Sequence, residues 1–120
     1  MTKVVSSLST EQLLDAYRAA ADLHGRSTIS GSSRTANGAA RRLAECNDEV
    51  QRRGAEAQEE FLRLLGDQSG DVRLWSAAHC LAFRPDLGEE VLEALILSGG
   101  HVGLSAQMTL REWRAGRLKL

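Results

Sequence analysis

The segment from Val72 to Phe83 is apolar on nearly all sides when it is read at 3.6 residues per turn. Arg73 is its only charged residue before Arg84. A helix that is apolar all round is a buried one, with neighbours on both flanks. We therefore expect this helix at the middle of a helical stack, with Trp75 central. One side would carry Val72, Trp75, His79, Ala82 and Phe83, and the other Leu74, Ala77, Ala78 and Leu81.

The first helix has strong start signals in the polar and apolar pattern. Ser9 can cap it, Gln12 completes a capping box, and Leu8 can pack on Leu13. The apolar stripe continues to Leu23 or His24, and we expect the helix to stop at Gly25. The Ser/Gly-rich stretch 26–34 then predicts a solvated loop.

A second long helix is predicted from Thr35 to Arg53, ended by Gly54. Asn37 and Asn47 lie near its packed side, and Asp48 and Arg52 have the i,i+4 spacing of an ion pair. A buried asparagine that satisfies backbone groups is the simplest interpretation of both Asn residues. The expected inner face consists of Ala36, Ala40, Leu43, Asn47 and Val50.

Three further helices follow from turn and capping signals. A helix over 55–65 ends at Gly66, and Ser69 is the expected cap of the central helix. Pro85 ends that central helix at Arg84 and precedes the next one, which Gly99 and Gly100 break. The last helix is expected over 102–114.

An internal repeat connects these helices. Trp75-Ser76-Ala77 and Leu81 match Leu104-Ser105-Ala106 and Leu110 at a fixed offset along the chain. Such a period predicts stacked helical hairpins. The expected fold is therefore all-α: five to six helices in antiparallel hairpins that form a short right-handed superhelix, in one domain over residues 1–120.

The repeat unit resembles a HEAT-type repeat, whose second helix often opens with Val-Arg followed by paired alanines, as in Asp71-Val72-Arg73 and Ala77-Ala78. Over residues 10–118 the chain is also similar to a family of small bacterial proteins classed only as a domain of unknown function. The matching segments are 35–37, 72–79 and 105–114. This resemblance implies an α-α superhelix and carries no activity or catalytic residues.

Composition narrows the function classes. The net charge of -1 speaks against a nucleic-acid binder. No apolar run is long enough to span a membrane, and the first residues lack an apolar signal core, so we expect a cytoplasmic protein. Cys46 and Cys80 are isolated and are expected to be buried reduced thiols.

Candidate chemistry is sparse. His79 and Cys80 are adjacent, so on a helix they point about 100° apart and cannot pair as nucleophile and base. No cofactor or metal motif is present, and we expect no catalysis. The alternative is a small-molecule or metal-binding protein or enzyme that uses His24, His79 or His101.

Charge segregation instead favours a non-catalytic protein-interaction module, such as a bacterial adaptor or a toxin-neutralising immunity protein. Acidic residues are concentrated in one predicted helix and basic residues in the last helix and tail. The basic segment could bind an acidic protein partner, or the acidic helix of a second copy in weak self-association. Trp and Arg are common interface anchors. The expected contact residues are Arg111, Trp113, Arg114, Arg117, Leu118 and Lys119, with Leu120 at the end, and the acidic Glu89, Glu90 and Glu93 as the face that a second copy would bind.

Overall fold

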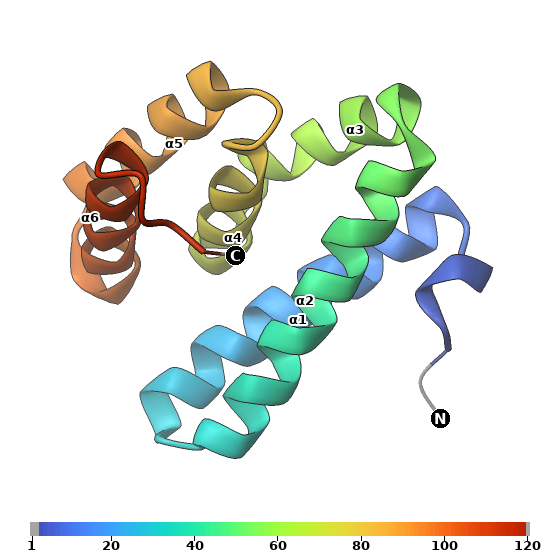
Figure 1. Cartoon of the computed structure of the whole chain (residues 1–120). Helices are drawn as coiled ribbons and strands as arrows, with labels where there is room; N and C mark the ends of the chain where they lie inside the picture. Colours follow the sequence, from blue (N-terminus) through green and yellow to red (C-terminus); the bar gives the residue numbers. More distant parts are fainter. Residues whose placement is uncertain (1–2, 120) are drawn as a thin grey trace. The chain divides into compact units, whose positions relative to one another are not determined.

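The computed structural model describes residues 3–119, and over them the chain is all-α, with six α-helices and no strand (Figure 1). The first three helices pack on one another in sequence order, and so do the last three, as the hydrophobic pattern predicted. The elements are η1 (Val5–Ser7), α1 (Thr10–Ser30), α2 (Ser33–Arg53), α3 (Ala55–Phe61), η2 (Leu62–Gly66), α4 (Gly70–Cys80), α5 (Pro85–Ser98) and α6 (Gly100–Arg114).

The chain divides into two compact units, Met1–Leu64 and Leu65–Leu120. The expectation of one continuous superhelical domain over residues 1–120 stays a prediction. In the part of the chain that the structure describes, no helix is both long enough and apolar enough to cross a membrane.

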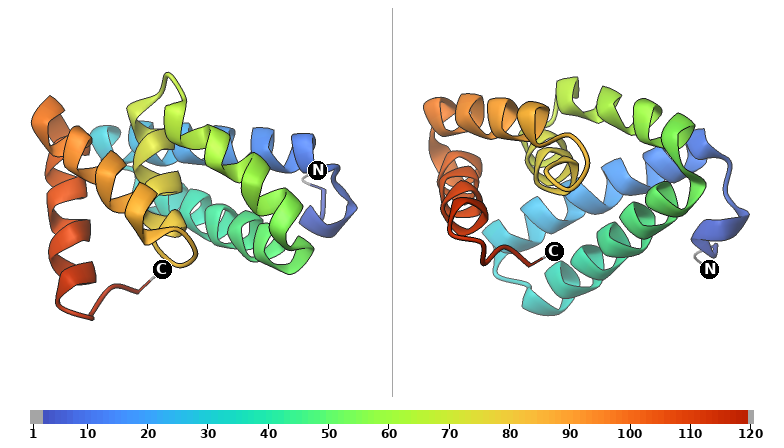
Figure 2. Two further views of the ribbon diagram at one scale, coloured as in Figure 1. Left: turned by 90° about the horizontal axis from the view of Figure 1, so that it is seen from above. Right: turned by 45° about the horizontal axis from the view of Figure 1, so that its top comes forward.

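The first unit is a hairpin of α1 and α2, closed by α3 (Figure 2). The predicted capping box is confirmed, because the Gln12 amide donates to Ser9 Oγ and the Ser9 amide donates to Gln12 Oε1. Tyr17 and Phe61 are fully buried and meet edge to face, with ring centroids 5.0 Å apart. These two rings are the largest side chains of the unit's core.

The predicted end of the first helix at Gly25 is wrong. Gly25 is buried within α1, which continues to Ser30 and turns at Gly31, whose φ is +83°. Ser27 and Thr28 donate hydrogen bonds from their hydroxyl groups to the carbonyls of the preceding turn. Both hydroxyl groups thus find acceptors within the helix, and the expected loop over 26–34 is reduced to a tight turn.

The packed face of α2 is also rotated from the expected one. Asn37 is exposed, and Asn47 is half-buried with its side chain accepting from Gln51, so neither is the buried asparagine expected. Arg52 pairs with Glu49 rather than with Asp48. The buried residues of the helix are Ala39, Leu43, Cys46, Glu49 and Val50.

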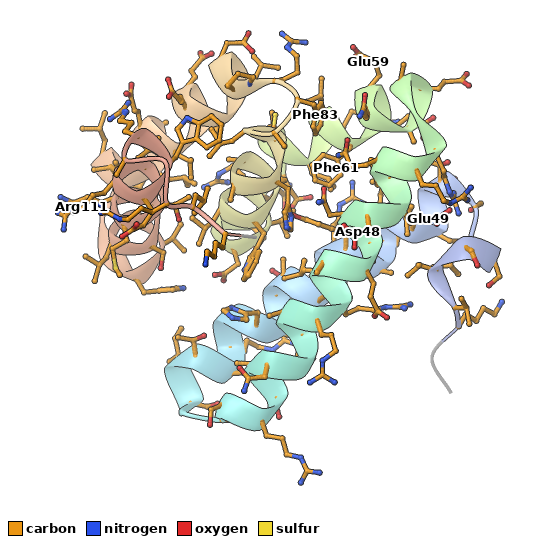
Figure 3. All side chains as sticks on the ribbon, viewed as in Figure 1. Asp48, Glu49, Glu59, Phe61, Phe83 and Arg111 are labelled. Carbon is orange, nitrogen blue, oxygen red and sulfur yellow. The ribbon has the colours of Figure 1, made fainter. Side chains whose placement is uncertain are left out.

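Glu49 lies on the second half of α2 (Figure 3) and is a buried carboxylate, with its side chain 6% exposed. It accepts hydrogen bonds from Arg52 and Arg53, and the same Arg53 donates to Thr10 Oγ1 and to the carbonyls of Val5 and Leu8. The bond to the Leu8 carbonyl is 2.6 Å long. The charged pair therefore ties the end of α2 to the start of α1.

Hydrogen bonds from Arg52 and Arg53 lower the pKa of Glu49 from 4.5 to about 2. The folded state thus favours the ionised carboxylate, and this stability is present above pH 4.5 and is lost as the pH falls toward 2. We expect Glu49→Gln to lower the free energy of unfolding at pH 7 and to flatten its decline between pH 4.5 and 2. Urea titrations across this range test it, with Glu45→Gln as an exposed control on the same helix. Equal acid sensitivity in Glu49→Gln and the wild type would contradict the assignment.

The second unit packs α4, α5 and α6 around a cluster of aliphatic side chains. The predicted cap is confirmed by the Val72 amide, which donates to Ser69 Oγ. Pro85 was expected only to precede α5 but is its first residue, and Gly99 and Gly100 make the turn into α6 with positive φ values. The cluster consists of Ala77, Leu81, Leu92, Leu95, Ala106 and Leu110.

Most of α4 is buried, which confirms the expectation for the central helix. The helix ends at Cys80, and a turn leads from Leu81 to Pro85. Three details of the prediction are wrong. The helix stops four residues before the expected end at Arg84. Trp75 is only partly buried, with its ring 5.9 Å from that of His79, and Ala82 is exposed because it lies in the turn.

Close backbone approach joins the helices of the second unit. A Cβ atom added to Gly88 would lie 2.7 Å from the Ala77 carbonyl oxygen, and one added to Gly103 would lie 3.0 Å from that of Leu95. Both glycines are buried inside helices. A larger residue at either position would force the paired helices apart.

We expect Gly88→Ala to lower the free energy of unfolding by about 1–3 kcal/mol, because the new methyl group meets a backbone carbonyl. Gly38→Ala is the matched control, since it lies inside α2 and an added Cβ would have no neighbour within 4 Å. That change should instead stabilise the protein by roughly 0.5–1 kcal/mol. Denaturant titration measures both, and a neutral Gly88→Ala would refute the close contact.

Candidate protein-binding surface

The structure brings the expected basic and acidic contact residues together within the second unit. The Trp113 indole Nε1 donates to Glu89 Oε1 at 3.1 Å, and Arg114 pairs with Glu93 at 2.6 Å. Docking of a second copy on these two carboxylates would therefore have to break contacts within one chain. The Arg114 pair is exposed, and such pairs contribute little stability, about 0–1 kcal/mol.

The last turn of α6 and the residues after it contact the same unit. Trp113 and Leu118 pack against the aliphatic cluster, and Arg117 pairs with Glu112 at 2.8 Å. This ion pair raises the pKa of Arg117 and lowers that of Glu112. Most of the expected contact residues are exposed, namely Glu90, Glu93, Arg111, Arg114, Arg117 and Lys119, and Leu120 lies outside the described residues. Trp113 thus helps to close the core, so less of its side chain is accessible to a partner.

An apolar stripe on α6 was missed by the sequence analysis. Leu104 is 60% exposed and Met108 57% exposed, and Arg111 continues the same face one turn later, where it points away from the helix (Figure 3). The spacing i, i+4, i+7 places the three side chains on one side of the helix. Ala106 and Leu110 are buried on the other side. The sequence does contain a signal for this stripe. Apolar residues occur on two faces of α6, and only one of those faces can pack against the core.

One more exposed apolar side chain lies on α5. Leu97 is 90% exposed near the end of that helix, three residues before α6 begins. Single exposed leucines are common on protein surfaces, so Leu97 carries little weight alone. Together with the α6 stripe, it makes the α5–α6 pair the part of the second unit with the most exposed apolar side chains.

The histidines do not form a ligand cluster. His79 is buried at 2% exposure, and desolvation lowers its pKa to about 4, so it is neutral at pH 7. His101 lies on the surface with its Nε2 3.2 Å from Asp71 Oδ1, and His24 is half-buried on α1 in the other unit. Among the described residues, no three His, Cys, Asp or Glu side chains are arranged to hold a metal ion.

Both cysteines are buried and free, as expected. Burial raises the pKa of each thiol to about 11. Cys46 and Cys80 are therefore protonated at pH 7, and protonated thiols are poor nucleophiles and poor metal ligands.

The comparisons with known proteins bear on the fold. No family model matches this chain. No curated protein matches it either. The crystal structure of the protein RPA1889 from Rhodopseudomonas palustris CGA009 is similar over 100% of this chain and 99% of that chain, with a TM-score of 0.87 and 22% sequence identity. At this identity the likeness shows a shared all-α fold alone.

Buried His79 predicts a pH dependence of stability. Its folded-state pKa of about 4 lies below the ordinary 6.5, so the unfolded chain binds the proton first as the pH falls. Its contribution, on the order of 3 kcal/mol, is present above pH 6.5 and is lost between pH 6.5 and 4. We expect His79→Gln to remove most of this decline, measured by urea titration. His101→Gln is the exposed control and should keep the wild-type profile; an unchanged profile in His79→Gln would contradict the assignment.

Proposed function

We propose that this chain is a non-catalytic protein-binding module whose contact surface is the outward face of α6. The observation that carries the proposal is the exposed pair Leu104 and Met108, continued by Arg111. Methionine and arginine are enriched in protein interfaces, and an exposed apolar stripe is most stable when another protein covers it. The face lies on a helix that the aliphatic cluster holds rigidly on its other side.

The charge of the surface supports a protein partner over other classes. The chain has a net charge of -1, and the cations Arg114 and Arg117 of α6 and the tail already pair with carboxylates. A polyanion such as a nucleic acid needs many free phosphate contacts. The α6 surface instead places one exposed cation, Arg111, beside two apolar side chains, Leu104 and Met108. It therefore fits a partner protein whose own surface has an apolar patch with an acidic edge.

A bacterial adaptor and a toxin-neutralising immunity protein are the two kinds of module within this proposal. We include in this proposal that the helix pairs are HEAT-like repeats, because helical-repeat modules commonly bind proteins through exposed helix faces. The shared fold with a bacterial protein supports a bacterial setting.

Photo-crosslinking tests the surface in cells. A photoreactive amino acid at position 104 or 108 should give adducts with a protein partner, whereas one at exposed Glu56 on α3 should not. The double variant Leu104→Ser with Met108→Ser should lower the affinity for the captured partner at least ten-fold. Its free energy of unfolding should stay within about 0.5 kcal/mol, because both residues are exposed. Equal adducts from all three positions, or an unchanged affinity, would sink the proposal.

A further inference from the structure

The first unit contains an open groove of about 900 Å³ between α1 and α2, bordered at one end by the segment that leads into η1. It has no part in the surface proposed above, which lies on the other unit. Its floor consists of small residues of both helices, so the backbones lie close to the surface. These residues are Ala16, Ala19 and Ala20 of α1 and Gly38 and Ala39 of α2.

Gly38 is not needed by the fold. It lies inside a 21-residue helix, where glycine costs roughly 0.5–1 kcal/mol relative to alanine. Its φ is not positive, and an added Cβ atom would meet nothing within 4 Å. Unlike Gly88 and Gly103, it permits no close contact within its own unit. The open space above it is the groove, so the backbone at Gly38 is open to close approach from outside.

The walls of the groove are apolar and its rim is basic. Leu23 is 38% exposed and Val4 is 69% exposed, and both line the groove. Three cations, Lys3, Arg41 and Arg42, also line it against one carboxylate, Glu45. The groove is thus locally positive in a chain whose net charge is -1. This local excess of positive charge selects an occupant that is acidic at its edges and apolar in its middle.

The shape of the groove suits a helix. The lining of α2 extends from Thr35 to Glu45, which corresponds to about 15 Å, or about three helical turns, at 1.5 Å per residue. A helix laid between two paired helices buries its apolar side on both, and small residues let the backbones approach within about 8–10 Å. An amphipathic helix in an apolar groove is a recurring mode of peptide recognition.

We propose that the α1–α2 groove binds an amphipathic helix of another protein, with small or aliphatic residues on its buried face and Asp or Glu along its flanks. The apolar side of that helix lies over Gly38 and between Val4 and Leu23. Its acidic flanks face Arg41, Arg42 and Lys3. This site is separate from the α6 stripe, so one module would have two binding surfaces.

The test is a selection from a displayed library of helical peptides with randomised surface positions, carried out on the full chain. We expect enriched peptides in which Asp and Glu outnumber Lys and Arg at the positions flanking an apolar stripe. Gly38→Leu, which fills the floor, should weaken their binding at least ten-fold. The pair Arg41→Gln with Arg42→Gln should weaken it about ten-fold and reduce its salt dependence.

Two controls separate binding from folding and this site from α6. Gly38→Leu should keep or raise the melting temperature, because leucine favours the helix more than glycine and a Cβ atom at this position has no neighbour within 4 Å. Leu104→Ser should leave peptide binding unchanged, so that a failure of the α6 proposal and a failure of this one give different results.

Several outcomes would overturn the inference. One is a selection that yields no peptides, or peptides with basic flanks. Another is a set of peptides whose affinity Gly38→Leu does not change. Self-association in sedimentation that Gly38→Leu abolishes would assign the groove to a second copy of the chain. Binding of laurate that competes with the selected peptides and is tighter than theirs would assign it to a small amphipathic acid.

Discussion

Close approach of helix backbones is the constraint on which both units depend. Aromatic residues make up only 4% of the chain, so apart from Tyr17 and Phe61 mostly small and aliphatic side chains fill the spaces between helices. Gly88 and Gly103 let α5 meet α4 and α6 at the distance of backbone contact, and Ala20, Ala21 and Ala39 fill small spaces in the α1–α2 hairpin. Cores of this kind gain stability from dense packing, and so they tolerate added volume poorly.

The helices and most of their boundaries were predictable because their signals are local. Ser9 with Gln12, Ser69 and the glycine pair at 99–100 act within one helical turn, and each was confirmed. Gly25 was misread because a glycine in sequence can end a helix or can allow close packing inside one. Only the surrounding structure distinguishes the two, and here the glycine is buried within α1.

The candidate sites were less predictable, since they depend on which side of a helix faces the core. The sequence showed the separated charges of α5 and α6 but not that Arg114 and Trp113 would bond to Glu93 and Glu89 in the same chain. Leu104 and Met108 were hidden in a helix with apolar residues on two faces. Glu49 resembled the other charged residues of α2, and its burial depends on Arg53 and on a chain segment more than forty residues away.

The two buried thiols give each unit its own chemical reporter of opening. Cys46 lies in the first unit and Cys80 in the second, and both are protonated and shielded from solvent when the helices are packed. A thiol reagent can react with either one only when its surroundings open. The rates at which the two sulfurs are alkylated in the native protein would therefore report the opening of one half of the chain independently of the other. Without any engineered label, the molecule can show whether its two halves unfold together.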